Sequence, residues 1–221
     1  MRRGGLGSSF DEIALNKALL DQNGVRLKGV ILNKVLPEKR EMVEKYMKKA
    51  LSRWNIPLLG LVPYNQLLST PSMEDFERLF NTHMLSGEEF HYRHFESIRL
   101  VATSVETFKE VLMPNQLLVT PATREDIVLA VIEKQESPLF KSSSSEKEPK
   151  HGIILTGRHP PTPQLIEKLK MSKIPSLYAD TNSFEAMRLI STFIAKIHRK
   201  DVLKIQKAID LVENSIDFTY L

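Results

Sequence analysis

The sequence predicts an α/β fold, in which helices alternate with short parallel strands. Two apolar runs, at residues 29–32 and 56–62, have the continuous hydrophobic character of strands buried on both faces of a parallel sheet. A segment with helical periodicity precedes each run, so residues 9–62 have the order helix, strand, helix, strand. The second half of the 221-residue chain repeats this alternation with shorter elements.

The first helix is expected from Ser9 to Gly24. Ser9 and Glu12 have the S-x-x-E spacing of a capping box, and Gly24 suits the left-handed residue that commonly ends a helix. A second helix is expected after Pro37, because apolar residues recur every three or four positions up to Trp54 and charged residues fill the other face. These helices separate the two predicted strands.

The second half begins after a break at residues 71–72. Its strands are expected at residues 98–102, 116–119, 153–155 and 175–178. Its helices are expected from Ser72, which has an acidic residue three positions later, over 105–112 and 123–132, from 162, over 182–198 and over 201–214. No element is predicted for residues 86–97. Residues 137–150 contain four consecutive serines and mixed charges, which are typical of a flexible surface insertion.

Composition and charge argue against several classes of function. The chain has 31 basic and 27 acidic residues, and its net charge of +4 is too small to indicate nucleic-acid binding. It contains no cysteine, which excludes disulfides, thiolate metal sites and cysteine nucleophiles. No apolar run approaches the ~18–20 residues that span a bilayer, and the residues after Met1 lack the apolar stretch of a signal peptide. We therefore expect a cytoplasmic protein without membrane or nucleic-acid partners.

The sequence contains no complete phosphate-binding loop. Residues 4–9 are glycine-rich and precede a predicted helix, whose first backbone amides could hold a phosphate. The pattern G-x-x-x-x-G-K-[ST] is absent from the whole chain, because no lysine follows the glycines. We interpret the glycines as a flexible turn, and we expect neither catalytic residues nor ATP hydrolysis by this chain alone.

Two strand-to-helix turns in the second half carry candidate ligand-binding residues. Residues 120–126 and 155–158 each follow an apolar strand, and ligands of open α/β sheets bind beyond the carboxyl ends of strands. Arg124 and Arg158 could offer guanidinium groups to an anion. Alternatively, Thr123 caps a helix while Arg124 pairs with solvent or with the next residue. The residues alone leave both interpretations open.

Asn33 and Lys34 follow the apolar run at 29–32. An asparagine amide at a strand end could pair with the edge of a purine base. Capping of the local backbone is the simpler interpretation, and the residue types alone favour it.

Three histidines, His83, His91 and His94, stand close together in the sequence. Imidazoles are common zinc ligands, but a zinc site needs three or four ligands that converge. The segment lacks a helical pattern that would bring these rings together. A polar connecting segment is therefore expected, and no metal site is predicted.

Several segments resemble two known families. Residues 5–16, 29–35 and 59–63 resemble the C-terminal half of a dethiobiotin-synthetase-like, or BioD-like, P-loop domain. Such a domain is found in the N-terminal part of long bacterial phosphotransacetylases and in proteins labelled cobyrinic acid a,c-diamide synthase. Residues 120–130, 152–157 and 174–181 are similar to three segments of the DRTGG domain.

This resemblance implies two domains. Residues 1–70 would form a partial, Rossmann-like half of a P-loop domain with parallel strands. Residues 71–221 would form a DRTGG-like α/β domain with closing C-terminal helices and a flexible insertion at 137–150. The Walker A loop and the magnesium-binding aspartate of the BioD-like family have no counterpart in the chain.

The resemblance also implies which residues bind ligands. An effector would contact Thr120, Thr123, Arg124, Asp126, Thr156, Gly157 and Arg158, and a nucleotide base would contact Asn33, Lys34 and Pro63. Two positions depart from the DRTGG signature: its aspartate is Thr123 here, and its second glycine is Arg158. The Arg158 side chain would project where the family leaves space, which argues against a ligand bound to bare backbone there.

The function implied by the resemblance is a regulatory, ligand-sensing and self-associating module that is not catalytic alone. Its ligand would be an adenine nucleotide or a small anionic metabolite, and no cofactor is certain. The alternative is a fragment of an ATP-dependent BioD-like synthetase or ligase, or of a phosphate acetyltransferase, whose catalytic parts lie outside this chain. A purely structural dimerisation module is a third possibility.

The predicted half-domain would have a strand edge with unpaired backbone groups. A sheet of so few parallel strands leaves an edge uncovered, which such sheets rarely tolerate. We expect a partner chain, such as a second copy, to cover this edge, unless the second domain or residues outside this chain do so.

Overall fold

The structure, a computed structural model, describes residues 6–136 and 151–220, which form two compact units. The first unit contains residues up to Gln66 together with those from Val202 onward, and the second contains Leu67–Asp201. The α/β fold class is confirmed. The predicted insertion at 137–150 and the glycines at positions 4 and 5 lie outside the described residues.

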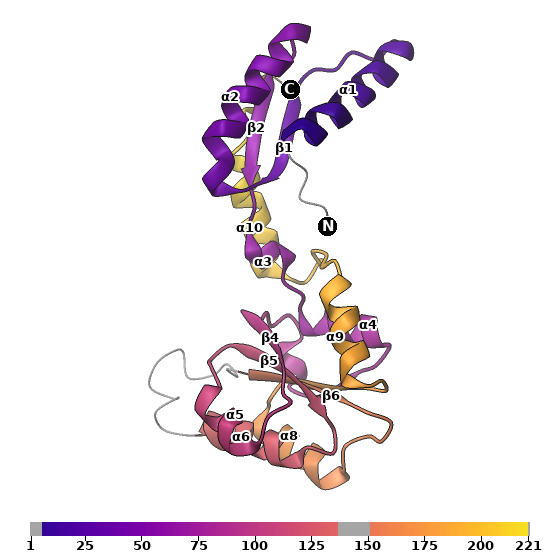
Figure 1. The fold of residues 1–221 in the computed structure, drawn as a ribbon, viewed down its shortest axis with the longest axis vertical. Helices are drawn as coiled ribbons and strands as arrows, with labels where there is room; N and C mark the ends of the chain where they lie inside the picture. Colours follow the sequence, from indigo (N-terminus) through magenta and orange to yellow (C-terminus); the bar gives the residue numbers. More distant parts are fainter. Residues whose placement is uncertain (1–5, 137–150, 221) are drawn as a thin grey trace. The chain divides into compact units, whose positions relative to one another are not determined.

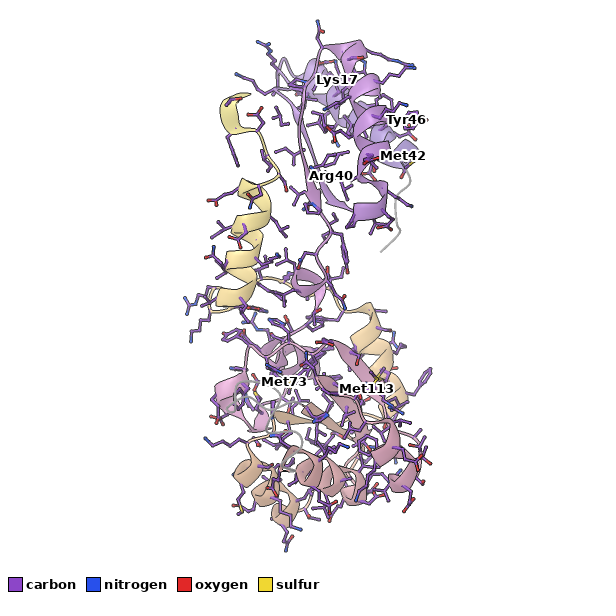
Figure 2. The ribbon with its side chains drawn as sticks, turned by 90° about the vertical axis from the view of Figure 1, so that its left-hand side faces the viewer. Lys17, Arg40, Met42, Tyr46, Met73 and Met113 are labelled. Atoms are coloured by element: carbon purple, nitrogen blue, oxygen red, sulfur yellow. The ribbon has the colours of Figure 1, made fainter. Side chains whose placement is uncertain are left out.

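The first unit is built on a two-stranded parallel sheet (Figure 1). Its elements are α1 (Leu6–Gln22), β1 (Val30–Val35), α2 (Arg40–Leu51), β2 (Leu58–Pro63) and α10 (Val202–Glu213), with short 3₁₀ turns at Pro37–Lys39, Ser52–Trp54 and Phe218–Tyr220. Side chains of α1 and α2 pack on one face of the sheet, where Phe10 stacks on Trp54 with ring centroids 5.1 Å apart. On the outer face of α2, Met42 and Tyr46 are exposed (Figure 2).

Strand β1 differs from its prediction in position and in burial. It starts at Val30 and continues to Val35, so Asn33 and Lys34 lie within it rather than after it. Ile31 is 41% exposed, whereas a strand buried on both faces was expected. The physical reason is that successive side chains of a strand alternate between faces: Val30 and Leu32 pack into the cluster with α1 and α2, and Ile31 lies on the opposite face.

The beginning of α1 also differs from the prediction. The helix starts at Leu6, which places Ser9 inside its first turns instead of at its cap. The predicted end is correct, since Gly24 has a φ of +68°, the left-handed conformation that suits glycine.

The C-terminal residues complete the first unit. After α10, Ile216 forms an antiparallel bridge with Gly60, and the Asp217 amide donates to the Leu59 carbonyl at 2.8 Å. A Cβ at position 60 would lie 2.4 Å from the Ser215 carbonyl oxygen, so only glycine allows this approach. The outer edge of β2 is therefore covered by this chain itself. Residues 202–220 were predicted to belong with the second domain, so the observed division of the chain differs from the boundary at residue 70.

The second unit is a five-stranded sheet in the order β3-β7-β6-β5-β4. Its strands are β3 (Met84–Ser86), β4 (Ser97–Leu100), β5 (Gln116–Pro121), β6 (His151–Thr156) and β7 (Ser176–Ala179). Strands β4 to β7 run parallel, and β3 pairs antiparallel with β7. The prediction contained the four parallel strands and missed β3, which has only three residues.

Helices cover both faces of this sheet (Figure 1). They are α4 (Met73–Phe80), α5 (Val105–Val111), α6 (Glu125–Glu136), α8 (Pro163–Ser172) and α9 (Ser183–Thr192), while the short α3 (Gln66–Ser69) crosses the boundary between the units. Helices α5, α6 and α8 bury one face, and α4 and α9 bury the other. Met73 is fully buried, whereas Met113 is exposed (Figure 2). Ser72 caps α4 through a complete capping box with Asp75, as its spacing predicted.

Helix α9 is shorter than predicted. It ends at Thr192, where Phe193 takes an extended conformation, although a helix to residue 198 was expected. The residues that follow are held by side chains distant in the sequence, and these contacts override the local helical pattern. None of the helices in the described residues is long and apolar enough to cross a membrane.

The close approach at Gly60 gives the first prediction. Gly60→Ala should destabilise the first unit by about 1–3 kcal/mol, because the added methyl group meets backbone atoms of Ser215 and Ile216 and must displace the segment that bridges to β2. Trp54, the only tryptophan, lies in this unit, so its fluorescence during urea unfolding measures the effect. Gly7→Ala is the matched control, since no atom lies within 4 Å of the added Cβ. Equal unfolding midpoints for the two variants would contradict the prediction.

Candidate functional site

The carboxyl ends of β5, β6 and β7 meet at one edge of the second unit. There the Thr156 hydroxyl donates to the Thr120 carbonyl at 3.2 Å and lies 2.7 Å from the Ser183 hydroxyl. Because Thr156 has a single hydroxyl proton, Ser183 must be the donor in their bond. The Gly157 amide donates to the Thr181 carbonyl at 2.7 Å. These bonds join the turns that follow three neighbouring strands.

The turn after β6 is open beside Gly157. This residue has a φ of +122°, which residues with side chains rarely adopt, and no described atom beyond its two chain neighbours lies within 4 Å of where its Cβ would be. The Tyr178 hydroxyl donates to the Gly157 carbonyl and so holds the turn to β7. Burial and the nearby Asp180 carboxylate raise the pKa of Tyr178, so this hydroxyl stays protonated as a donor at neutral pH.

Arg124 forms hydrogen bonds with two residues of the same unit, Asp126 and Thr103. Its guanidinium forms a two-point contact with the Asp126 carboxylate, at 2.9 and 2.8 Å, and donates to the Thr103 carbonyl at 3.1 Å. The hydrogen bonds from Arg124 lower the pKa of Asp126, and the same contact raises the pKa of Arg124. Pairing with Glu125 was the suggested alternative, but Glu125 instead accepts from Thr162 at 2.8 Å. Arg124 thus ties the loop after β4 to the turn after β5.

Arg158, unlike Arg124, has a guanidinium group that is available to bind a ligand. It is exposed on the turn after β6 and forms no hydrogen bond or ion pair with the residues that the structure describes. Thr123 is also exposed, whereas the hydroxyl of Thr120 is buried and has no hydrogen-bond partner. The structure therefore brings Thr120, Thr156 and Gly157 together, with Arg158 next to them in the sequence.

Three residues of this edge were missed by the sequence analysis: Thr103, Thr181 and Ser183. Each follows directly after a strand or begins the next helix, so the rule that pointed to residues 120–126 could have included them. Their partners are 21 to 27 positions away, however, and no spacing in the sequence indicates them.

The second predicted group, Asn33, Lys34 and Pro63, lies in the first unit. The Asn33 side-chain oxygen accepts from the Lys34 amide at 2.8 Å, and Lys34 has a φ of +61°. Pro63 is paired with Val35 in the sheet register. The amide of Asn33 thus stabilises an irregular turn of β1, which agrees with the backbone-capping interpretation.

A family model described as the DRTGG domain matches residues 77–193, more than half of the chain. The chain belongs to the DRTGG domain family. The second unit is therefore its DRTGG unit. A model described as an AAA domain matches residues 2–72, which agrees with the resemblance of the first part of the chain to a P-loop domain.

Curated relatives of the whole chain are named phosphate acetyltransferase. The protein of Pseudomonas aeruginosa is 25% identical over 87% of this chain and 28% of its own length. That of Synechocystis sp. is 27% identical over 93% of this chain and 29% of its own length. That of Escherichia coli is 23% identical over 75% and 22%. The chain thus spans less than a third of the length of these relatives.

Among the solved structures that match the chain is that of the CBS and DRTGG domains of the regulatory region of Clostridium perfringens pyrophosphatase, complexed with the activator diadenosine tetraphosphate. The identity is 15%, the TM-score is 0.44, and the match covers 84% of this chain and 90% of the other.

The three histidines near the start of the DRTGG unit do not share one set of partners. His91 pairs with Glu77, and the fully exposed His83 lies 3.9 Å from the other oxygen of the same carboxylate, while His94 lies 2.9 Å from Asp201. Among the described residues no group of three or more histidine, aspartate or glutamate side chains could hold a metal ion.

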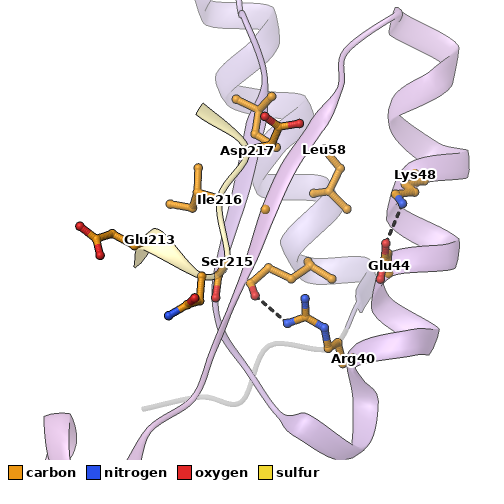
Figure 3. A pocket seen from close by; sticks show the side chains of 12 residues that line it. Arg40, Glu44, Lys48, Leu58, Glu213, Ser215, Ile216 and Asp217 are labelled. Carbon is orange, nitrogen blue, oxygen red and sulfur yellow. Dashed lines mark hydrogen bonds and ion pairs between the residues drawn. The ribbon is translucent and has the colours of Figure 1, made fainter. Parts of the chain in front are cut away.

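The first unit has a hollow of about 310 Å³ beside β2, shown in Figure 3. Arg40, Glu44 and Lys48 of α2 lie on one side of it, and residues 213–217 lie on the other. Arg40 donates to the Leu61 carbonyl at 2.9 Å, and Lys48 pairs with Glu44 at 2.6 Å. Both cations are thus engaged, and none of the predicted base-contacting residues lines the hollow.

The Arg124–Asp126 contact predicts a pH-dependent coupling. A double-mutant cycle with Arg124→Ala and Asp126→Ala should give a coupling free energy of up to about 1 kcal/mol near neutral pH. The value is small because the side chains are 30% and 45% exposed, so solvent screens their charges. The folded pKa of Asp126 is lowered, so this coupling should be present above the ordinary value of 3.8 and lost as the pH falls below it. Urea unfolding at several pH values measures it.

The exposed pair of Lys109 and Glu133, at 2.8 Å, is the matched comparison, because it makes a single contact without the bond to a distant carbonyl. A coupling of Arg124 and Asp126 that does not change between neutral and acidic pH would contradict the assigned ion pair.

Proposed function

We propose that this chain is a regulatory module whose DRTGG unit binds an adenine nucleotide or a small anionic metabolite at the carboxyl ends of β5, β6 and β7. The observation that carries the proposal is the open turn at Gly157 and Arg158. The space where a Cβ of Gly157 would stand is open, and it lies next in the chain to a guanidinium with no described partner, at the edge where open α/β sheets bind their ligands.

The chemistry of this edge supports an anionic ligand. Arg158 carries a permanent positive charge and can donate two parallel hydrogen bonds to a phosphate or carboxylate. The buried Thr120 hydroxyl lacks a partner, and buried polar groups without one are uncommon. Arg124, in contrast, is occupied by Asp126 and Thr103, so we assign it the shaping of the site and not the binding of the ligand.

The similarity to phosphate acetyltransferases supports a role in a larger enzymatic context. This chain matches less than a third of each relative, and it contains no phosphate-binding loop of the G-x-x-x-x-G-K-[ST] type. We propose that it is not catalytic alone and acts in the cytoplasm, where a cysteine-free chain suits the reducing conditions.

Replacement of Arg158 tests this proposal. With ATP, ADP, AMP, acetyl phosphate and inorganic phosphate as probes in calorimetry and thermal-shift assays, at least one should bind the native chain. Arg158→Ala should then weaken binding about 10- to 100-fold, because a hydrogen bond to a charged group contributes roughly 1.5–3 kcal/mol. The stability without ligand should not change, since Arg158 is exposed.

Arg188→Ala is the matched control, because Arg188 is an exposed arginine of the same unit that is paired with Glu185. Equal weakening by both substitutions would indicate a nonspecific charge effect. Binding of every probe unchanged by Arg158→Ala would refute the assigned site.

A second candidate function is a fragment of an ATP-dependent BioD-like synthetase or of a phosphate acetyltransferase. It is favoured by the AAA-domain match over residues 2–72 and by the names of the relatives. Under our proposal the purified chain shows no measurable ATP turnover. Steady phosphate release that persists through repurification would favour this second candidate.

We further propose that the module self-associates through the first unit. In the described part of the chain, β1 has no neighbour on its outer edge. Leu15 and Leu19 of α1 and Ile31 of β1 are exposed in the same unit. A second copy that covers these apolar side chains would complete the sheet. Sedimentation showing a monomer at all concentrations would contradict this.

A further inference from the structure

The last segment of the DRTGG unit, residues 193–201, is held mainly by polar side chains. It has no regular structure after the end of α9. Two of its apolar residues, Ile194 and Ile197, are 66% and 45% exposed, so burial of these side chains contributes little. His198 and Asp201, in contrast, are largely buried. The attachment of this segment therefore depends on the contacts of these two residues.

The ring of His198 lies between two carboxylates of α4. Its Nε2 is 2.7 Å from Asp75 Oδ1, and its Nδ1 is 3.7 Å from Glu74 Oε2. All three side chains are at most 15% exposed. Both nitrogens of the ring thus face acidic oxygens, although a neutral imidazole carries only one N–H.

The other oxygens of the two carboxylates have partners within α4. The second oxygen of Asp75 accepts from the Ser72 amide at 2.9 Å as part of the capping box. Glu74 Oε1 accepts from Arg78 at 2.6 Å. Glu74 Oε2 is buried and has no hydrogen-bond partner, so the nearby Nδ1 is the group in position to serve it.

Glu74 is a carboxylate near neutral pH. Burial raises its pKa, but hydrogen bonds from Arg78 and Tyr92 and the charge of His198 outweigh burial, and the net pKa is lowered. If His198 were neutral with its proton on Nε2, the lone pair of Nδ1 would face this carboxylate. A ring protonated on both nitrogens removes that repulsion and places a positive charge 3.7 Å from the carboxylate.

We propose that His198 is held as an imidazolium cation between Glu74 and Asp75, and that this charge fastens residues 193–201 to α4. The charged and titratable groups around the ring are these two carboxylates, Arg78 and Tyr92, with Asp201 of the same segment and its partner His94 nearby. Loss of the proton leaves the buried Oε2 of Glu74 facing the lone pair of Nδ1, which loosens the segment.

Nitrogen NMR of the full chain tests the charge state directly. At about pH 7.5, above the ordinary pKa of histidine, both ring nitrogens of His198 should be protonated. His83 gives the reference for an exposed ring in the same spectrum, since its side chain is fully exposed. A neutral His198 ring at this pH would overturn the proposal.

Substitution of Glu74 tests the cause. Glu74→Gln should lower the protonated fraction of His198, because the carboxylate that faces Nδ1 is removed while the length of the side chain is kept. Glu185→Gln is the matched control, because Glu185 likewise accepts from an arginine in its own helix, Arg188, and contacts no histidine. Equal protonation in the Glu74→Gln variant and the native chain would overturn the assignment.

Hydrogen exchange followed by mass spectrometry tests the attachment. Between about pH 6 and about pH 9, exchange in residues 193–201 should increase several-fold more than in α8, after correction for the intrinsic effect of pH. The same change in both segments would show that the charge of His198 does not hold the segment. None of these measurements depends on a bound ligand, so the outcome is independent of the proposed function.

Discussion

Burial of β5 and β6 on both faces is the constraint on which the rest of the DRTGG unit depends. The two strands pair in register from Gln116 and His151 to Pro121 and Thr156, with helices over each face. Because no water reaches these strands, their backbone groups must bond to each other until the strands end. The first place where the chain can turn, expose backbone and meet a ligand is therefore the edge that carries Thr156 and Gly157.

The sequence alone predicted the central strands well, because continuous apolar runs have few alternatives to burial in a parallel sheet. It also predicted the cap of α4, because Ser72 and Asp75 are local partners. It failed where distant contacts decide the structure. The three residues of β3 carry no pattern of their own, and α9 ends early because the chain beyond it is attached to α4. The exposure of Ile31 was also missed, because an apolar run predicts burial of a strand but does not show which element would cover each face.

The candidate site shows the same limit at the level of single side chains. The sequence placed Arg124 and Arg158 in corresponding turns and could not distinguish them. The structure does, because Arg124 reaches a carbonyl 21 positions away and a carboxylate in the first turn of α6, whereas Arg158 has no described partner. An arginine of this kind supports a site by holding two loops in place, and its removal alters binding only indirectly.

The contact of residues 216 and 217 with β2 at Gly60 has a consequence for how this protein folds during synthesis. The first unit is discontinuous in sequence: it consists of the residues up to Gln66 and those from Val202 onward. During synthesis, β2 leaves the ribosome long before the segment that covers its edge, and the whole DRTGG unit is translated in between. A newly made first unit therefore has an open strand edge until residues 202 onward have been synthesised.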